Sequence, residues 1–336
     1  MKIVAITGKE QSEIKDVPDP VIRTPFAKIK ITRVPLCTEW KNWVDGSVSE
    51  TLGHEAVGII ADTSGRSSFK PGDRVIVMPE NGCGTCTLCL AGEHIHCEHP
   101  INALAVAGSS TGRATYAQYC IQQEHLLLRI PDDISDDHAA MALCALGPTF
   151  NAMQKMQVHA GETVLISGLG AVGLGGVINA VARGARVIAL EMHPYRTKLA
   201  LSLGAEAVID PKDPGALKHI LALTNDRGAD ASVETSSAPD ALSFIAEATQ
   251  RMGRIAIVGW AGSIIGAQLV KKGLTVFGAW HWNHLRDAEA MFTTIRRSRA
   301  LLDRFITHRF PMSRIEDAWT AQRSGECGKI LVDPWQ

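Results

Sequence analysis

The sequence predicts an α/β protein of two domains: a β-rich domain and a domain built on a doubly wound parallel sheet. Residues 1 to about 145 contain short apolar runs, such as 27–34 and 56–60, bounded by Gly, Pro and Asp. This pattern is typical of barrels and sandwiches. From residue 163 onward, apolar strands alternate with helices, as they do in a parallel sheet covered on both faces. A chain of 336 residues is long enough for both domains.

The bounds of each element follow from local composition. In the β-rich part, apolar runs closed by turn residues predict strands at 1–8, 27–34, 56–60 and 74–78, and a helical segment covers 136–146. In the second part, apolar runs predict strands at 163–167, 186–190, 207–210, 231–234, 254–258 and 274–278. Helices are expected at 171–183, 193–203 and 238–249, and a long helix over 285–299 precedes a last strand at 329–332.

Composition argues against several classes of protein. The net charge of -1 provides no global field that would attract nucleic acid or an anionic membrane. The longest apolar stretch, 163–181, is interrupted by five glycines, so no membrane span is expected. Eight cysteines without a secretory signal indicate a reducing compartment. We therefore expect a cytoplasmic protein whose closely spaced cysteines bind metal.

Four cysteines lie close together in one short segment: Cys83, Cys86, Cys89 and Cys97. Thiolates at this spacing are typical ligands of a structural zinc ion, which is held tetrahedrally by soft donors. An iron–sulfur cluster shares the spacing of the first three. The longer gap before Cys97 favours zinc.

A second metal site is suggested by His54 and Glu55, with Cys37 upstream and Cys144 downstream. A catalytic zinc takes three protein ligands and leaves one position exchangeable. Cys37, His54 and Cys144 are candidates for those three ligands.

A glycine-rich turn, Gly168-Leu-Gly170-Ala-Val-Gly173, follows a predicted strand and begins a predicted helix. In this context the glycines allow a tight turn and let a pyrophosphate approach the helix N-terminus. Glu191 ends the next strand about 20 residues later, where an acidic side chain binds the adenosine ribose. It favours NAD over NADP, although Arg196 could bind a phosphate. The expected cofactor-binding residues are Gly168, Gly170, Ala171, Val172, Gly173, Glu191 and Arg196.

On these motifs, together with Gly53-His-Glu-Ala-Val-Gly58 and Gly72-Asp-Arg-Val75, the chain resembles the zinc-containing medium-chain dehydrogenase/reductase family, which includes alcohol, sorbitol and threonine dehydrogenases. The resemblance implies a GroES-like catalytic domain at 1–146 and 285–336 that holds both zinc ions. It also implies a Rossmann NAD-binding domain at 147–284. By the same resemblance, Cys37, His54 and Cys144 of the GroES-like domain match the ligands of catalytic zinc, and Glu55 matches a glutamate that approaches the metal. Lys329 matches a position near the pyrophosphate.

The chain departs from the family pattern after its first ligand. Family members have a hydroxyl residue two positions after the cysteine, whereas this chain reads Cys37-Thr38-Glu39. One interpretation is that a residue is missing, so that Thr38 relays the proton and Glu39 orients the ligand histidine. The other is that Glu39 itself carries protons or contacts zinc. Asn42 stands where a relay histidine often lies.

The predicted function is zinc-dependent hydride transfer between a small-molecule alcohol and NAD. Aromatic and polar residues in the segments 39–43 and 280–284 suggest a cleft for a secondary alcohol of the polyol, sugar or cyclitol type. Packing of these tryptophans at a domain or subunit contact is the competing interpretation. Simple aliphatic or aromatic alcohols are the alternative substrates, and a non-catalytic protein that binds NAD and zinc is the alternative class. The resemblance also implies a homodimer or homotetramer, with 274–278 as an edge strand.

Overall fold

The computed structural model describes residues 1–102, 111–260, 262–264 and 266–336. The chain divides into two compact units. The first unit comprises Met1–Leu143, Asn283–Ile295 and Ile306–Gln336. The second comprises Cys144–Trp282 and Arg296–Phe305. None of the helices within the described ranges has the length and apolar character that a membrane span requires.

The second unit is built on a six-stranded parallel sheet in the order β10-β9-β8-β11-β12-β13. The strands are β8 (Thr163–Ser167), β9 (Arg186–Leu190), β10 (Ala207–Ile209), β11 (Ala229–Glu234), β12 (Thr249–Ile257) and β13 (Thr275–Gly278). The order of strands reverses between β8 and β11, and ligands of such sheets bind at the carboxyl ends of the strands at this point. The predicted doubly wound sheet is confirmed, and β13 is its edge strand.

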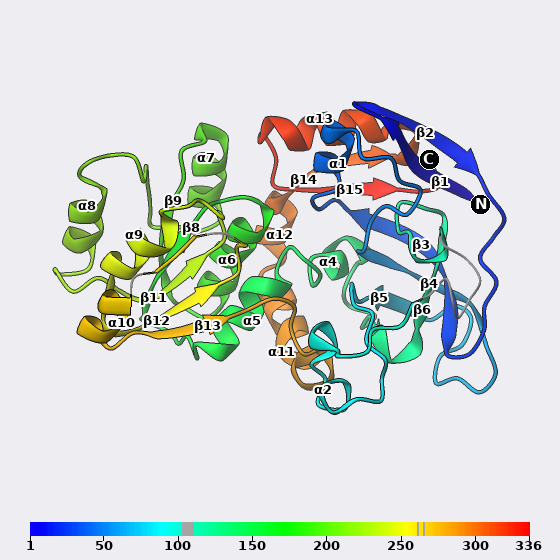
Figure 1. The fold of residues 1–336 in the computed structure, drawn as a ribbon, viewed down its shortest axis with the longest axis horizontal. Helices are drawn as coiled ribbons and strands as arrows, with labels where there is room; N and C mark the ends of the chain where they lie inside the picture. The colour runs from blue at the N-terminus through cyan, green and yellow to red at the C-terminus, as the bar shows by residue number, and fades with distance from the viewer. Residues whose placement is uncertain (103–110, 261, 265) are drawn as a thin grey trace. The chain divides into compact units, whose positions relative to one another are not determined.

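Helices cover both faces of this sheet. They are α5 (Gly147–Lys155), α6 (Ala171–Ala182), α7 (Pro194–Ser202), α8 (Ala216–Leu223), α9 (Ala241–Ala248), α10 (Gly266–Lys272) and α12 (Arg299–Phe305). Helices α5 and α6 pack together on one side of the strands, and α8 and α9 pack together on the other (Figure 1). Their apolar faces and the strands between them form a core that includes Leu165, Ile188, Ile220 and Ile245.

The predicted helix over 136–146 is interrupted. Helix α4 (Asp136–Ala140) ends early, turns follow, and α5 begins at Gly147. Pro148 lies in the first turn of α5, where its missing N–H group has no intrahelical partner to lose. A new helix therefore begins at this position.

The first unit contains a seven-stranded sheet in the order β14-β15-β3-β4-β5-β7, with β6 paired to β3. Its strands are β3 (Phe26–Pro35), β4 (Ala56–Thr63), β5 (Arg74–Val77), β6 (Tyr119–Gln123), β7 (Leu127–Arg129), β14 (Ile306–Pro311) and β15 (Lys329–Asp333). A hairpin of β1 (Lys2–Gly8) and β2 (Gln11–Asp16) lies beside it. In β3, Ala27, Ile29 and Ile31 are buried while Lys30 is exposed, the two-residue period of a strand with one face on the core.

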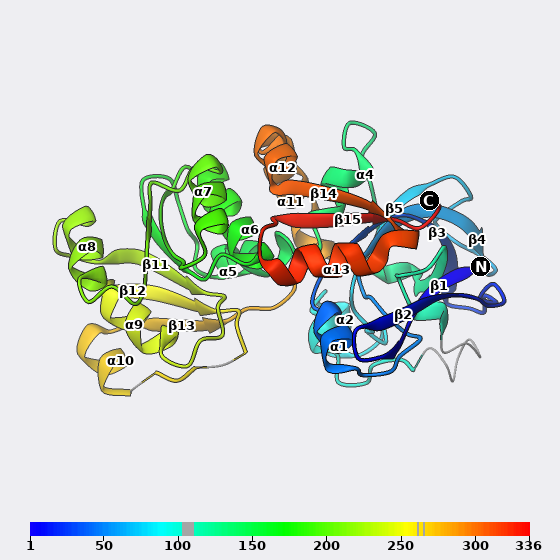
Figure 2. The same cartoon turned by 90° about the horizontal axis from the view of Figure 1, so that it is seen from above.

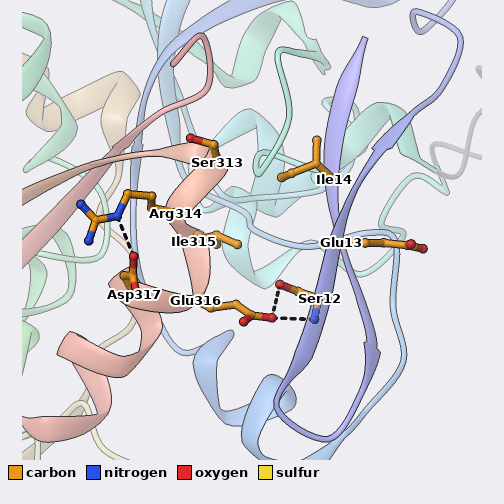
Figure 3. A pocket seen from close by; sticks show the side chains of 8 residues that line it. All are labelled: Ser12, Glu13, Ile14, Ser313, Arg314, Ile315, Glu316 and Asp317. Atoms are coloured by element: carbon orange, nitrogen blue, oxygen red, sulfur yellow. Dashed lines mark hydrogen bonds and ion pairs between the residues drawn. The ribbon is translucent and has the colours of Figure 1, made fainter.

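The helices of the first unit are short except for α11 and α13. They are α1 (Trp40–Asp45), α2 (Thr87–Leu90), α4, α11 (His284–Arg297) and α13 (Ile315–Ser324). Figure 2 shows α13 beside the β1–β2 hairpin. A Glu316 carboxylate oxygen accepts hydrogen bonds from the backbone N–H and the hydroxyl of Ser12, each 2.8 Å long, and Figure 3 shows this side chain reaching from the helix to β2. These bonds attach the hairpin to α13.

A close contact inside the second unit gives a prediction of stability. A Cβ atom at Gly175 in α6 would lie 1.8 Å from the carbonyl oxygen of Ala145, so the helix must shift to accommodate Gly175→Ala. We expect the free energy of unfolding to fall by about 1–3 kcal/mol, measured by urea denaturation. The matched control is Gly266→Ala at the start of α10, where no heavy atom lies within 4 Å of the added carbon. Equal losses in the two variants would contradict the prediction.

Candidate active site and metal centres

The four-cysteine segment forms a compact group in the first unit. The sulfur atoms of Cys83, Cys86, Cys89 and Cys97 all lie within 4.8 Å of one another. Two sulfur pairs, Cys83–Cys89 and Cys86–Cys97, are 3.9 Å apart. A tetrahedral zinc ion with Zn–S bonds of about 2.3 Å sets sulfur atoms about 3.8 Å apart, so the donor set fits zinc.

Backbone groups around the cysteines favour thiolates. The Cys83 sulfur accepts from the N–H groups of Thr85 and Cys86 at 3.4 and 3.3 Å. The hydrogen bond from the Thr85 hydroxyl, together with these two N–H groups, lowers the pKa of Cys83 to about 5, whereas burial raises the pKa of Cys89 to about 12. A bound cation offsets such a burial cost, because thiolates are the form that ligates zinc.

The cysteine segment is attached to the start of α11. The side-chain amide of Asn283 donates a 2.7 Å hydrogen bond to the carbonyl oxygen of Ala91. Gly92 has a φ of +82°, and a Cβ atom there would lie 2.2 Å from Asn283 Oδ1. Only glycine tolerates both the left-handed backbone and the close approach.

The second metal group contains Cys37, His54, Glu55 and Cys144, which each offer one ligand atom, all within 4.8 Å of one another. Cys37 follows β3, and His54 and Glu55 immediately precede β4. Cys144 is joined by one peptide bond to Leu143, the last residue of the first segment of the first unit. The soft sulfur and imidazole donors are those expected for a catalytic zinc ion.

Glu39 orients the imidazole of His54. Its carboxylate lies 2.7 Å from His54 Nδ1 and accepts a 3.0 Å hydrogen bond from the Tyr116 hydroxyl. This leaves Nε2 of His54 for a metal ion. Burial raises the pKa of Glu39, but the hydrogen bond and charge of His54 and the hydrogen bond from Tyr116 together outweigh burial, so the pKa is lowered overall. In the absence of metal, burial lowers the pKa of His54. Hydrogen bonds with Cys37 and Glu39 and the charges of nearby carboxylates outweigh burial and raise this pKa to about 11.

The contact between Glu39 and His54 is the one that the first interpretation of the Cys-Thr-Glu segment expects. Glu39 is not among the residues that could hold the ion. Thr38 is exposed just before α1. Asn42 lies within α1, and its carbonyl oxygen accepts hydrogen bonds from Gly46 and Ser47.

Glu55 and Lys329 form a buried ion pair. Lys329 Nζ lies 3.2 and 3.4 Å from the two oxygens of Glu55, and both side chains are 1% exposed. Burial raises the pKa of Glu55 to about 7, although the charge of Lys329 opposes the rise. The family resemblance predicts Lys329 near the pyrophosphate. Its observed partner in the first unit is the carboxylate of Glu55.

One contact beside this site was not foreseen from the sequence. In the second unit, Nε2 of the buried His281 lies 3.6 Å from the sulfur of Cys144. The only signal was its place in the aromatic segment 280–284.

The expectation that the tryptophans of 39–43 line a cleft is wrong for Trp43. It is 5% exposed, and its ring packs 5.7 Å from that of Trp319 in the core. Trp282 is likewise buried against Phe150.

The glycine-rich turn forms one wall of a pocket of about 450 Å³ at the carboxyl ends of β8 and β9. Gly168 has a φ of +86°, and a Cβ atom at Gly173 would lie 1.9 Å from the carbonyl oxygen of Gly168. No heavy atom lies within 4 Å of a Cβ built at Gly170. The turn therefore has no room for a side chain at Gly173 but is open at Gly170, just before α6 begins with Ala171 and Val172. A pyrophosphate at the N-terminus of a helix needs such an opening.

Glu191 lines the same pocket and is held by backbone groups. One carboxylate oxygen accepts from the N–H of Leu169 at 2.9 Å, and the other accepts from Met192 and His193 at 2.8 and 3.0 Å. Arg196 lies 3.9 Å from Glu191 and also lines the pocket. The predicted ribose-binding carboxylate thus faces the pocket in a fixed orientation.

The Glu39–His54 contact gives a prediction for metal binding. We expect Glu39→Gln to weaken zinc binding at the second group by a factor of between about 10 and 100, because the imidazole loses its anionic partner. Titration of the loaded protein with a competing chelator measures this, and zinc held by the four cysteines serves as an internal reference. Glu50→Gln, which removes a carboxylate from the surface beside Lys15, is the control. Unchanged zinc affinity in the Glu39 variant would contradict the proposed orientation.

Comparison with known proteins identifies relatives over nearly the whole chain. A family model for zinc-binding dehydrogenases matches residues 171–296, and one for the alcohol dehydrogenase GroES-like domain matches 27–132. L-threonine 3-dehydrogenase of Pectobacterium atrosepticum is 31% identical, over 99% of this chain and 94% of the relative. Sorbitol dehydrogenase of Bacillus subtilis is 28% identical, over 99% of this chain and 97% of the relative.

Solved structures agree with the fold. Alcohol dehydrogenase TADH from Thermus sp. ATN1 has a TM-score of 0.87 and 24% sequence identity, and the match covers 99% of each chain. The predicted GroES-like and Rossmann architectures are confirmed, and the zinc-binding dehydrogenase model together with the two groups of metal ligands supports zinc as the metal. Since two family models match most of its length and a relative exceeds 30% identity, the chain belongs to the zinc-containing medium-chain dehydrogenase/reductase family and is an enzyme that acts on CH–OH groups.

Proposed function

We propose that the protein oxidises a secondary alcohol of the polyol or sugar type by transferring a hydride to NAD. The observation that supports this most directly is the group Cys37, His54, Glu55 and Cys144 with its imidazole fixed by Glu39. The relatives named sorbitol and L-threonine 3-dehydrogenase act, by their names, on compounds with several polar groups. These names support a polar substrate, whereas Trp43 is buried and gives no support for an aromatic wall of the cleft.

The residues of the chain have separate roles in this proposal. Zinc bound by Cys37, His54 and Cys144 would supply Lewis acidity that favours loss of the hydroxyl proton. Glu39 keeps the imidazole in one tautomer, and Thr38 passes the proton to solvent from its exposed position before α1. Glu55 belongs to the same metal group and is the buried partner of Lys329, so it would bring a carboxylate close to the ion.

NAD is proposed over NADP because of the charge of Glu191. The carboxylate lies in the pocket beside the glycine turn, where it would accept hydrogen bonds from ribose hydroxyls and repel a 2′-phosphate. Arg196 already lies close to this carboxylate, so its charge is partly offset.

The eight cysteines are all thiols in the structure, and this supports the proposal of a reducing, cytoplasmic location. We also propose a homodimer or homotetramer that uses the exposed edge of β13. Sedimentation of the purified protein measures the state of assembly.

The catalytic role of the metal group is tested with His54→Ala. We expect the rate of NADH formation from sorbitol, threonine and simple secondary alcohols to fall at least about 100-fold, because the metal loses a ligand and Glu39 loses its partner. His219→Ala on the exposed face of α8 is the control and should retain activity. Full turnover by the His54 variant would contradict the assignment.

The choice of cofactor is tested with Glu191→Ala. Removal of the carboxylate should lower kcat/KM for NAD by about tenfold, the equivalent of about 1.4 kcal/mol, and should raise the NADP-to-NAD ratio of kcat/KM. Asp210→Ala, which removes a carboxylate exposed after β10, is the control. A wild-type preference for NADP would refute this part of the proposal.

A further inference from the structure

We propose that the buried carboxylate of Glu234 stabilises the positively charged nicotinamide ring of bound NAD over the uncharged ring of NADH. This inference rests on the proposed function, because it concerns the cofactor of the same reaction. When NAD accepts a hydride from the alcohol carbon, a proton enters the ring with two electrons, and the positive charge of the ring disappears. A fixed negative charge in the cofactor-binding unit would therefore favour the oxidised form.

Glu234 is the last residue of β11 and lies one strand away from the glycine-rich turn. It pairs in register with Ser167, the residue directly before Gly168. Glu191, which would bind the adenosine ribose, follows β9 on the other side of β8. A cofactor whose pyrophosphate lies at the start of α6 would therefore extend with its nicotinamide end toward β11.

One oxygen of this carboxylate is occupied by three donors. Oε1 of Glu234 accepts 2.6 Å hydrogen bonds from the backbone N–H and the hydroxyl of Ser236, and a 2.9 Å hydrogen bond from the N–H of Ser237. An ionised carboxylate only accepts hydrogen bonds, and donors of this kind suit that form. The side chain thus holds its charge in a fixed orientation.

The other oxygen of Glu234 lies against Gly259, just after β12. Oε2 has no hydrogen-bond partner among the residues that the structure describes, and Glu234 is 0% exposed. A Cβ atom at Gly259 would lie 2.1 Å from this oxygen, so a side chain at that position would displace the carboxylate. The charge is therefore enclosed between the carboxyl ends of β11 and β12.

No Lys, Arg or His of the described part of the chain forms an ion pair with this carboxylate. Two other carboxylates of the second unit have arginine partners, since Glu162 pairs with Arg254 and Glu206 pairs with Arg186. Glu234 is more deeply buried than either. A buried charge without a counter-ion is costly unless a cation compensates it. The nicotinamide ring of NAD is such a cation, and the ring of NADH is not.

The same carboxylate also supports one wall of the cofactor pocket. Thr235 and Ser236 line this pocket, and the Thr235 hydroxyl donates to the carbonyl oxygens of Ser167 and Gly168 at 2.9 and 2.8 Å. Loss of this support would weaken the binding of NAD and NADH alike. Loss of the charge would weaken the binding of NAD alone, so the two effects can be separated.

The test measures the dissociation constants of NAD and NADH by calorimetric titration of the zinc-loaded protein without an alcohol. We expect Glu234→Gln, which keeps the shape of the side chain and one acceptor oxygen, to weaken NAD binding about tenfold more than NADH binding. This is a modest effect for a charge inside a protein. ADP-ribose lacks the nicotinamide, so its affinity should change by the same factor as that of NADH.

Two variants control for the structural role. Glu234→Asp keeps the charge and shortens the side chain, so it should weaken NAD and NADH binding by similar factors. Glu247→Gln removes an exposed carboxylate of α9 and should change neither. Glu234→Met removes the charge without burying an unpaired donor, and it decides the question if Glu234→Gln fails to fold. A wild-type ratio of the two affinities in the neutral variant, or an equally altered ratio in Glu234→Asp, would overturn the inference.

The binding constants do not depend on which alcohol is oxidised, so they separate this inference from the proposed function. An altered ratio in Glu234→Gln supports the inference even if no polyol or sugar is oxidised. Normal oxidation of such alcohols with an unaltered ratio refutes the inference alone. If the enzyme prefers NADP, the same titrations use NADP and NADPH, whose rings differ by the same charge.

Discussion

The short contact between Glu39 and His54 is the interaction on which the rest of the candidate active site depends. Three separate parts of the first unit meet there, because Glu39 precedes α1, His54 precedes β4, and Tyr116 donates to the same carboxylate. One carboxylate thereby fixes the tautomer and the plane of a metal-ligating ring. This contact is the one that the first interpretation of the Cys37-Thr38-Glu39 segment expects.

Burial of charge is the second constraint on this unit. Glu55 and Lys329 are both almost completely buried, and each is the partner of the other. Removal of either would leave an uncompensated charge in a region of low dielectric. Arg113 is the contrasting case, because its charge has only dipoles around it. The same unit therefore contains one buried cation paired with a carboxylate and one cation whose hydrogen-bond acceptors are all neutral.

The sequence predicted those features whose residues are close in the chain. The four-cysteine segment and the glycine turn are local patterns, and both form the expected geometry. The sequence left two interpretations of Glu39 open, because only tertiary packing determines which group its carboxylate meets. Trp43 was misassigned because an aromatic residue near a metal ligand and one in the core look alike in sequence. His281 gave only the weak signal of its place in the segment 280–284, since its partner Cys144 is distant along the chain.

Asn283 attaches the cysteine segment to the position where the chain re-enters the first unit from the second. Its amide bonds Ala91, and its oxygen accepts from the N–H of Arg286 in the first turn of α11. Asn283 consequently joins the cysteine segment, which would hold the structural metal, to the start of α11. Loss of the ion would free the loop and release the amide, so a metal that takes no part in the reaction would influence how the start of α11 is held.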